Sequence, residues 1–163
     1  MMSLEIKELV QKKRFLIESF FYSISLKPEA STDNVLRHAV TGHFLKAIVL
    51  ELIIKALFEL DHKEVVPFTH NLANIFKDLN VETKVQLSSL YNKARKRHEH
   101  HFASVKIKDV VFHPLNKALS NNELTIKNFK YDAMGTNSNA SIDSAFIKDV
   151  FEFIDVKIIQ LDV

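Results

Sequence analysis

The chain of 163 residues contains no cysteine, no tryptophan, two glycines and three prolines. Without cysteine it has no disulfide framework, no thiolate metal site and no cysteine nucleophile. The scarcity of glycine and proline argues against collagen-like, linker-rich and turn-rich all-β proteins and favours long helices. Hydrophobic residues make up 47% of the chain and charged residues 26%, which is typical of a globular protein. We therefore expect a single helical domain over residues 1–163.

A long uncharged apolar run is also missing. The most apolar stretch, residues 44–58, contains Lys46, Glu51 and Lys55, whereas a membrane-spanning helix needs about 18 or more consecutive apolar residues. The first residues carry charges throughout and lack the apolar centre and cleavage site of a secretory signal. We expect a cytoplasmic protein with no membrane contact.

Apolar residues recur at helical spacing along most of the chain. The pattern is clearest over residues 33–61, where the helix is apolar almost all round and is therefore expected at the centre of a bundle. Segment 105–119 is ambiguous between strand and irregular helix, and the asparagine-rich segment of about 120–140 is expected to be loop. The sequence predicts an all-α, up-and-down bundle of four or five main helices. These are expected at about 3–25, at 33–61, from residue 69 or 70, from the cap Asn80 into 95–101, and after the cap Ser141.

Positive charge is concentrated in one segment. The net charge is only +2, but residues 84–108 carry seven cations and one acid, whereas residues 120–163 carry four cations and seven acids. Within the basic segment, residues 95–101 read Arg-Lys-Arg-His-Glu-His-His. An imidazole that moves protons near neutral pH and a guanidinium that stabilises a phosphoryl group suffice for metal-free RNA cleavage. The alternative is a solvated helix end, where cations suit the helix dipole.

The sequence lacks the residues that a metal site, a glycine-rich phosphate-binding loop or a nucleophile elbow would need. Two histidines on one helix face, His98 and His101, are too few for a stable zinc site, and the adjacent cations repel a metal ion. There is no glycine-rich phosphate loop and no nucleophile elbow. We expect neither a metal site nor a cofactor, and any phosphate must be bound by side chains.

Two stretches of the chain resemble the HEPN superfamily (higher eukaryote and prokaryote nucleotide-binding), a group of helical bundles. The first is the apolar helix with Glu51 and Lys55 embedded in it. The second is residues 70–76, His-Asn-Leu-Ala-Asn-Ile-Phe, which is similar to the family's His-Asp-Leu helix start. A weaker third match lies at residues 128–131, where Lys130 stands in the position of an arginine. The resemblance covers about a quarter of the chain.

The resemblance implies a metal-independent endoribonuclease of toxin or defence type. In such proteins an arginine, four to six residues and a histidine form the site, which is often duplicated across a homodimer. Arg95 followed by His100 or His101 fits this spacing, and so does Arg37 followed by His43. On a straight helix, residues 95 and 100 are about 140° apart, whereas residues 97 and 101 are about 40° apart. Which arginine and histidine converge is left open.

Two functions follow. The first is an RNA-directed, HEPN-like protein with Arg95, His100 and His101 as catalytic residues, acting as a homodimer. The alternative is a non-catalytic helical module that dimerises or partners a nucleotidyltransferase or an antitoxin. In the first hypothesis the substrate is held by further basic residues of segment 84–108 and by residues of the second and third motifs: Lys93, Lys96, Arg97, His70 and Lys130.

Overall fold

The computed structural model describes residues 4–26, 31–105, 112–128 and 142–162. Every regular element within these ranges is a helix, so the expected all-α fold class is confirmed. The six helices are α1 (Leu4–Ser25), α2 (Thr32–His62), α3 (Leu72–Asp78), α4 (Val81–Ser104), α5 (Leu115–Asn128) and α6 (Ser144–Asp162).

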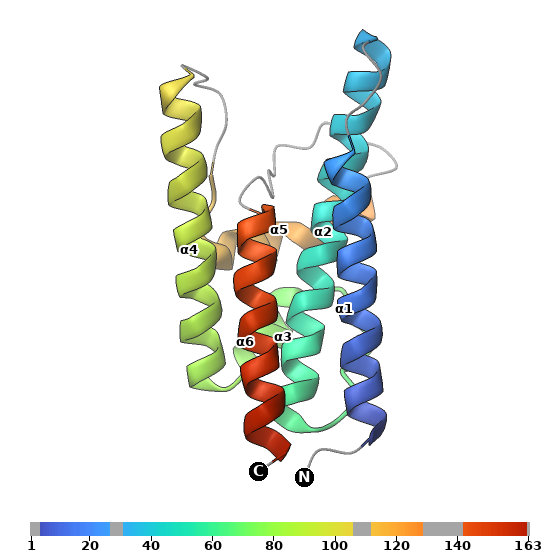
Figure 1. The fold of residues 1–163 in the computed structure, drawn as a ribbon, viewed down its shortest axis with the longest axis vertical. Helices are drawn as coiled ribbons and strands as arrows, with labels where there is room; N and C mark the ends of the chain where they lie inside the picture. Colours follow the sequence, from blue (N-terminus) through green and yellow to red (C-terminus); the bar gives the residue numbers. More distant parts are fainter. Residues whose placement is uncertain (1–3, 27–30, 106–111, 129–141, 163) are drawn as a thin grey trace.

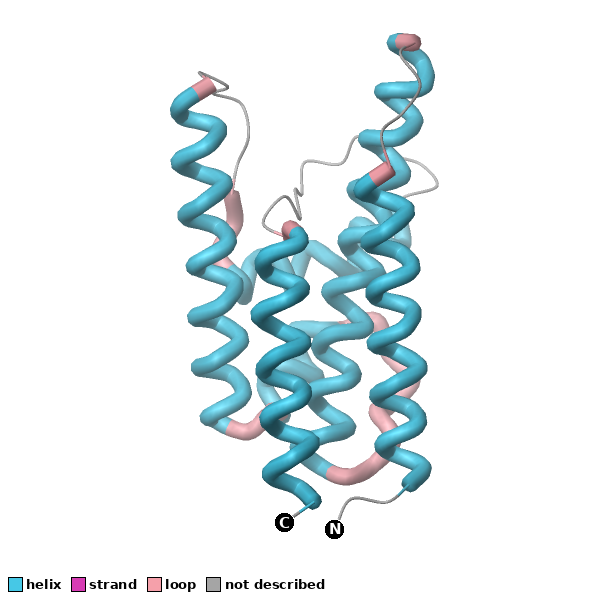
Figure 2. Tube along the Cα trace, in the orientation of Figure 1, coloured by secondary structure: helices cyan, strands magenta, loops and turns pink. Residues whose placement is uncertain are grey.

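Four long helices form the frame of the bundle. Helices α1, α2, α4 and α6 have nearly parallel long axes and alternate in direction, while α3 and α5 lie behind them (Figure 1). The same arrangement is visible in the tube view (Figure 2), where the start of α1 and the end of α6 lie at one end of the molecule. No described helix has both the length and the hydropathy of a membrane span.

Helix α2 occupies the centre, as its apolar pattern predicts. It contacts α1, α3, α5 and α6, and complete burial of each large aliphatic side chain contributes about 1.5–3 kcal/mol. Even Glu51, one of the charged residues within this apolar helix, is buried. Among the described side chains of α2, the buried apolar ones are Ala47, Val49, Leu50, Ile53, Ile54, Ala56, Leu57, Phe58 and Leu60.

Several helix boundaries differ from the expected ones. Helix α3 begins at Leu72 rather than at residue 69 or 70, because Asn71 is the N-cap and its side chain accepts a hydrogen bond from the Asn74 N–H (3.1 Å). Asn80 does occupy the N-cap position of α4, but its side chain makes no capping bond. Helix α5 continues to Asn128, so the first residues of the segment expected to be loop are helical.

The N-cap of α6 is Asp143. Its Oδ1 accepts a hydrogen bond from the Phe146 N–H at 2.7 Å, and its carbonyl oxygen accepts one from the Ile147 N–H at 3.0 Å. An aspartate at this position satisfies a free backbone donor and also suits the positive end of the helix dipole. The expected cap, Ser141, lies outside the described residues.

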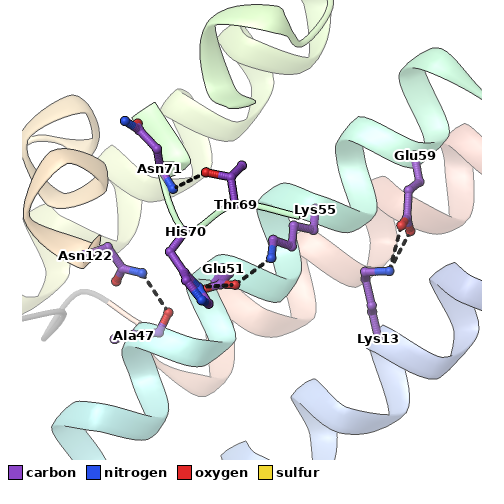
Figure 3. A network of polar contacts seen from close by, with 9 residues as sticks. All are labelled: Lys13, Ala47, Glu51, Lys55, Glu59, Thr69, His70, Asn71 and Asn122. Atoms are coloured by element: carbon purple, nitrogen blue, oxygen red, sulfur yellow. Dashed lines mark hydrogen bonds and ion pairs between the residues drawn. The ribbon is translucent and has the colours of Figure 1, made fainter. Parts of the chain in front are cut away.

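The end of α2 is fixed by buried ion pairs. Lys13 of α1 contacts both carboxylate oxygens of Glu59 at 2.8 Å (Figure 3). Two residues further along α2, the fully buried carboxylate of Asp61 lies 2.8 Å from the Lys157 ammonium of α6. The Thr83 hydroxyl and the Asn80 N–H also donate to this carboxylate, each at 2.8 Å. These contacts join α1, α2, α4 and α6 at one end of the bundle.

Candidate functional site

The structure does not bring Arg95 onto the histidines predicted to act with it. The Nη1 atom of Arg95 lies 2.8 Å from Oε1 of Glu99, one turn further along α4. His100 and His101 are exposed. Because α4 is continuous here, residues 95 and 100 point in directions about 140° apart. The described contacts of Arg95 are therefore internal to its helix.

Two more basic residues of the predicted site, Lys93 and Lys96, lie on the surface of α4. Lys93 forms an ion pair with Asp149 of α6, with 2.9 Å between Nζ and Oδ2. Lys96 is exposed. Lys130 lies outside the described residues, as does the side chain of Arg37.

A different pair on α4, Arg97 and His98, converges on the N-cap of α6. The Nη2 atom of Arg97 lies 2.9 Å from Oδ1 and 3.1 Å from Oδ2 of Asp143. The Nε2 atom of His98 lies 3.0 Å from the same Oδ2 atom. One carboxylate thus caps a helix and holds an adjacent guanidinium and imidazole on a second helix.

Helix α2 contributes Lys46, which interacts electrostatically with Asp143, and His43, which interacts electrostatically with Lys46. Burial lowers the pKa of Lys46, and the negative charge of Asp143 opposes this shift. His43 lies one turn earlier on α2, on the same face as Lys46. The Nε2 atom of His43 is buried and has no hydrogen-bond partner among the described residues. We call these five residues the cap cluster: His43, Lys46, Arg97, His98 and Asp143.

The electrostatics of the cap cluster favour neutral imidazoles at neutral pH. Burial lowers the pKa of His43, and the positive charge of Lys46 lowers it further. Burial also lowers the pKa of His98, against the opposing effect of Asp143. Neutral imidazole is the form that accepts a proton.

The carboxyl group of Asp143 stays ionised. Burial raises its pKa, but hydrogen bonds from Arg97 and from the Phe146 N–H, together with the charges of Arg97 and His98, outweigh burial and leave the pKa below its usual value. The cap cluster therefore combines two imidazoles of lowered pKa, the amine of Lys46, the guanidinium of Arg97 and one ionised carboxylate.

The two motifs that carry the family resemblance meet at a second polar group. His70, in the segment before α3, places Nδ1 3.1 Å from both carboxylate oxygens of Glu51 (Figure 3). Lys55 pairs with Glu51 at 2.7 Å on the same helix. Nearby, the side-chain amide of Asn122 donates to the Ala47 carbonyl at 3.1 Å. These contacts link α2, the start of α3 and α5, and no described contact joins His70 to Arg97.

The sequence predictions named only Arg97 from the cap cluster as a substrate-binding residue, and named His43 only as a partner for Arg37. Lys46 and Asp143 were missed. The signal for Asp143 is its position directly before the first apolar residues of the last helix, which is typical of an N-cap. Nothing in the spacing predicts that Arg97 and His98 meet it.

Within the described part of the chain, no three residues of histidine, aspartate or glutamate are grouped as a metal site. Comparison with protein-family models, curated proteins and solved structures finds no match for this chain. The functional argument consequently depends on the residues themselves.

Proposed function

We propose that this chain is an RNA-directed, HEPN-like protein that cleaves phosphodiester bonds without a metal ion, and that the cap cluster performs the reaction. The observation that carries the proposal is the convergence of Arg97 (2.9 Å) and His98 (3.0 Å) on Asp143, together with the buried Nε2 atom of His43, which like Nε of Arg95 has no hydrogen-bond partner in the described structure. A buried polar atom without a partner costs free energy. A substrate that supplies the missing partner would offset that cost. The proposed location is the cytoplasm.

The residues of the cluster suit a transesterification. His43 would accept the proton of the ribose 2′-hydroxyl, whose oxygen then attacks the phosphorus. The bond from phosphorus to the 5′-oxygen breaks, and His98, after taking up a proton from solvent, would pass that proton to this oxygen, while His43 would later release its own proton to solvent. The products are a 2′,3′-cyclic phosphate and a 5′-hydroxyl. Lys46 and Arg97 would stabilise the charge on the phosphoryl oxygens, and Asp143 would position His98.

RNA as the substrate is supported by the charge distribution. The basic segment 84–108 contains Arg97 and His98, and its exposed cations Lys93 and Lys96 lie on the same helix. Such cations bind the phosphate backbone with an affinity that falls as salt concentration rises. Partners in this proposal are RNA and, from the resemblance, a second copy of the chain, a nucleotidyltransferase or an antitoxin.

The test is cleavage of a labelled single-stranded RNA in the presence of a chelator. We expect His43→Gln and His98→Gln each to lower the cleavage rate about 10²–10⁴-fold, while the purified variants keep the wild-type helical content. The matched control is His62→Gln, since His62 is an exposed histidine of α2 outside the cluster.

A fourth variant separates the two predicted sites. The double substitution His100→Ala with His101→Ala removes the histidines originally expected to act with Arg95, and we expect it to cleave at nearly the wild-type rate. If the double variant is inactive and His43→Gln is active, the reaction belongs to Arg95 and the exposed histidines. If no protein cleaves RNA, the nuclease proposal fails.

The alternative function, a non-catalytic interaction module, is favoured by the pairing of both candidate guanidiniums. Arg97 is held by Asp143 and Arg95 by Glu99, so each positive charge is already compensated. In this reading the cap cluster connects α4 to α6, and the function lies on an outer surface of the bundle.

A further inference from the structure

Aromatic rings form a row near the C-terminal end of α4. The imidazole of His98 stacks on the ring of Phe112, which lies just before α5, with 6.3 Å between the ring centroids and 24° between the ring planes. The ring of Phe102, on the last turn of α4, meets Phe112 edge-on, with centroids 5.3 Å apart and planes at 71°. We call these three residues the aromatic row: His98, Phe112 and Phe102.

The two phenylalanines lie outside the hydrophobic core. Neither belongs to the core of the described residues or to the apolar side chains packed against it, and each is only partly buried. The last turns of α4 extend beyond the start of α6 (Figure 1). Rings that pack on one another beyond the core keep part of their surface accessible to solvent.

The aromatic row begins within the cap cluster. His98 belongs to both groups, because its Nε2 atom lies 3.0 Å from Oδ2 of Asp143 while its ring stacks on Phe112. The neighbouring Arg97 carries the guanidinium proposed to stabilise a phosphoryl group, and Lys96 adds an exposed cation on the same helix. Proteins bind single-stranded nucleic acid with this combination, in which cations hold the phosphates and aromatic rings hold the bases.

We propose that the aromatic row binds nucleobases of single-stranded RNA, with the partly exposed rings of Phe102 and Phe112 as stacking surfaces. The inference rests on the proposed function for its ligand, RNA, and adds which part of the nucleotide the chain recognises. Every base has a face that can stack, so we expect little preference among bases. The bases of a duplex are already stacked and paired, so the row selects single strands.

The first experiment separates base binding from cleavage. Its ligands are a short single-stranded 2′-O-methyl RNA, which lacks the 2′-hydroxyl that cleavage needs, and the same strand with abasic sugars. Both strands carry the same phosphates, so the difference between their dissociation constants measures the contribution of the bases. We expect fluorescence anisotropy to show that the wild-type chain binds the base-bearing strand about 10-fold more tightly.

Substitution of either ring should reduce this difference. Phe102→Leu and Phe112→Leu keep an apolar side chain but remove the ring, and we expect each to weaken binding of the base-bearing strand about 5-fold or more without changing binding of the abasic strand. The control is Phe15→Leu, at a phenylalanine of α1 that is 68% exposed. Equal weakening of both strands by the two row variants would show that the rings only support the end of α4, and would overturn the inference.

The second experiment compares two forms of the same RNA. A 2′-O-methyl duplex of equal length offers the phosphates without accessible base faces, so we expect the wild-type chain to bind it more weakly than the single strand. Phe112→Leu should reduce this preference. A wild-type chain that binds the duplex as tightly as the single strand would contradict stacking on the aromatic row.

Failure of this inference is distinguishable from failure of the proposed function. If the wild-type chain cleaves natural RNA but binds base-bearing and abasic strands equally, the nuclease proposal stands and the aromatic row does not bind bases. If the chain binds the base-bearing strand selectively and cleaves no RNA, the aromatic row stands as a binding surface and the nuclease proposal fails.

Discussion

Helix α2 carries polar groups of two different kinds along its length. Near its C-terminal end, Glu59 and Asp61 are buried carboxylates, each with a lysine at 2.8 Å. Four turns earlier, His43 has a buried nitrogen without a partner in the described structure, and the neighbouring Lys46 lies in an environment that lowers its pKa. The first group is saturated with hydrogen bonds, whereas the second has unused capacity.

We therefore assign the first group to the stability of the bundle and the second group to the proposed reaction. Buried charges with complete partners fix the relative positions of helices, and their removal is expected to affect folding. Residues with perturbed pKa values cluster at functional sites. The comparison predicts that substitutions in the first group reduce stability much more than substitutions in the cap cluster.

The largest effect is expected at Asp61. Asp61→Ala leaves the Lys157 ammonium buried without its counter-charge and removes the acceptor for Thr83 and Asn80, so we expect a loss of about 3–5 kcal/mol in the free energy of unfolding. Urea denaturation measures this loss. Glu64→Ala, at an exposed carboxylate close by, is the control and should change stability little. A similar loss in both variants would contradict the structural role of the buried pair.

A smaller effect is expected at Asp143. Asp143→Ala removes the N-cap of α6 and the contacts to Arg97 and His98, and we expect a loss of about 1–3 kcal/mol because the cluster is partly solvated. Asp143→Asn keeps a capping oxygen and should recover part of the loss. If Asp143→Ala lowers the free energy of unfolding as much as Asp61→Ala does, the cap cluster contributes as much to stability as the ion pairs at the end of α2.

The smallest effect is expected from acidification. Since the pKa values of His43 and His98 are lowered in the folded chain, the unfolded chain takes up protons first as the pH falls below about 6.5. Stability is therefore unaffected above that pH and declines as the pH falls below about 6.5, by about 1 kcal/mol or less. The lowered pKa of Asp143 contributes only below about pH 4.

Denaturation at several pH values measures this decline. His43→Gln should flatten the slope, whereas His100→Gln, at an exposed histidine, should leave it unchanged. A decline of equal size in the His43→Gln protein would show that the proton is taken up elsewhere.

The helices were largely predictable from the sequence, because each depends on local periodicity. The apolar pattern predicted residues 33–61 as one central helix, and α2 spans Thr32–His62. The contacts at helix ends were less predictable where a residue of another helix takes part. Asn80 lies at the start of α4 as expected, but its N–H donates to Asp61, a residue of another helix.

The site was harder to predict from the sequence, because it too depends on contacts between residues of different helices. The rule relating Arg95 to His100 considers one helix, whereas the observed cluster depends on Arg97 and Asp143, which are 46 residues apart. Periodicity indicates which side of a helix faces inward but does not state which residue of another helix lies opposite. The catalytic and substrate-binding assignments made from the sequence remain predictions.

Asp143 holds Arg97 and His98 with the same carboxylate that closes the first turn of α6. An anion that binds Arg97 would weaken the contact of Arg97 with the Asp143 carboxylate. That change would alter how readily the first turn of α6 unfolds. Ligand occupancy and local fraying are thus thermodynamically linked. Hydrogen exchange at the amides of Phe146 and Ile147 would register a bound phosphate even when nothing is cleaved.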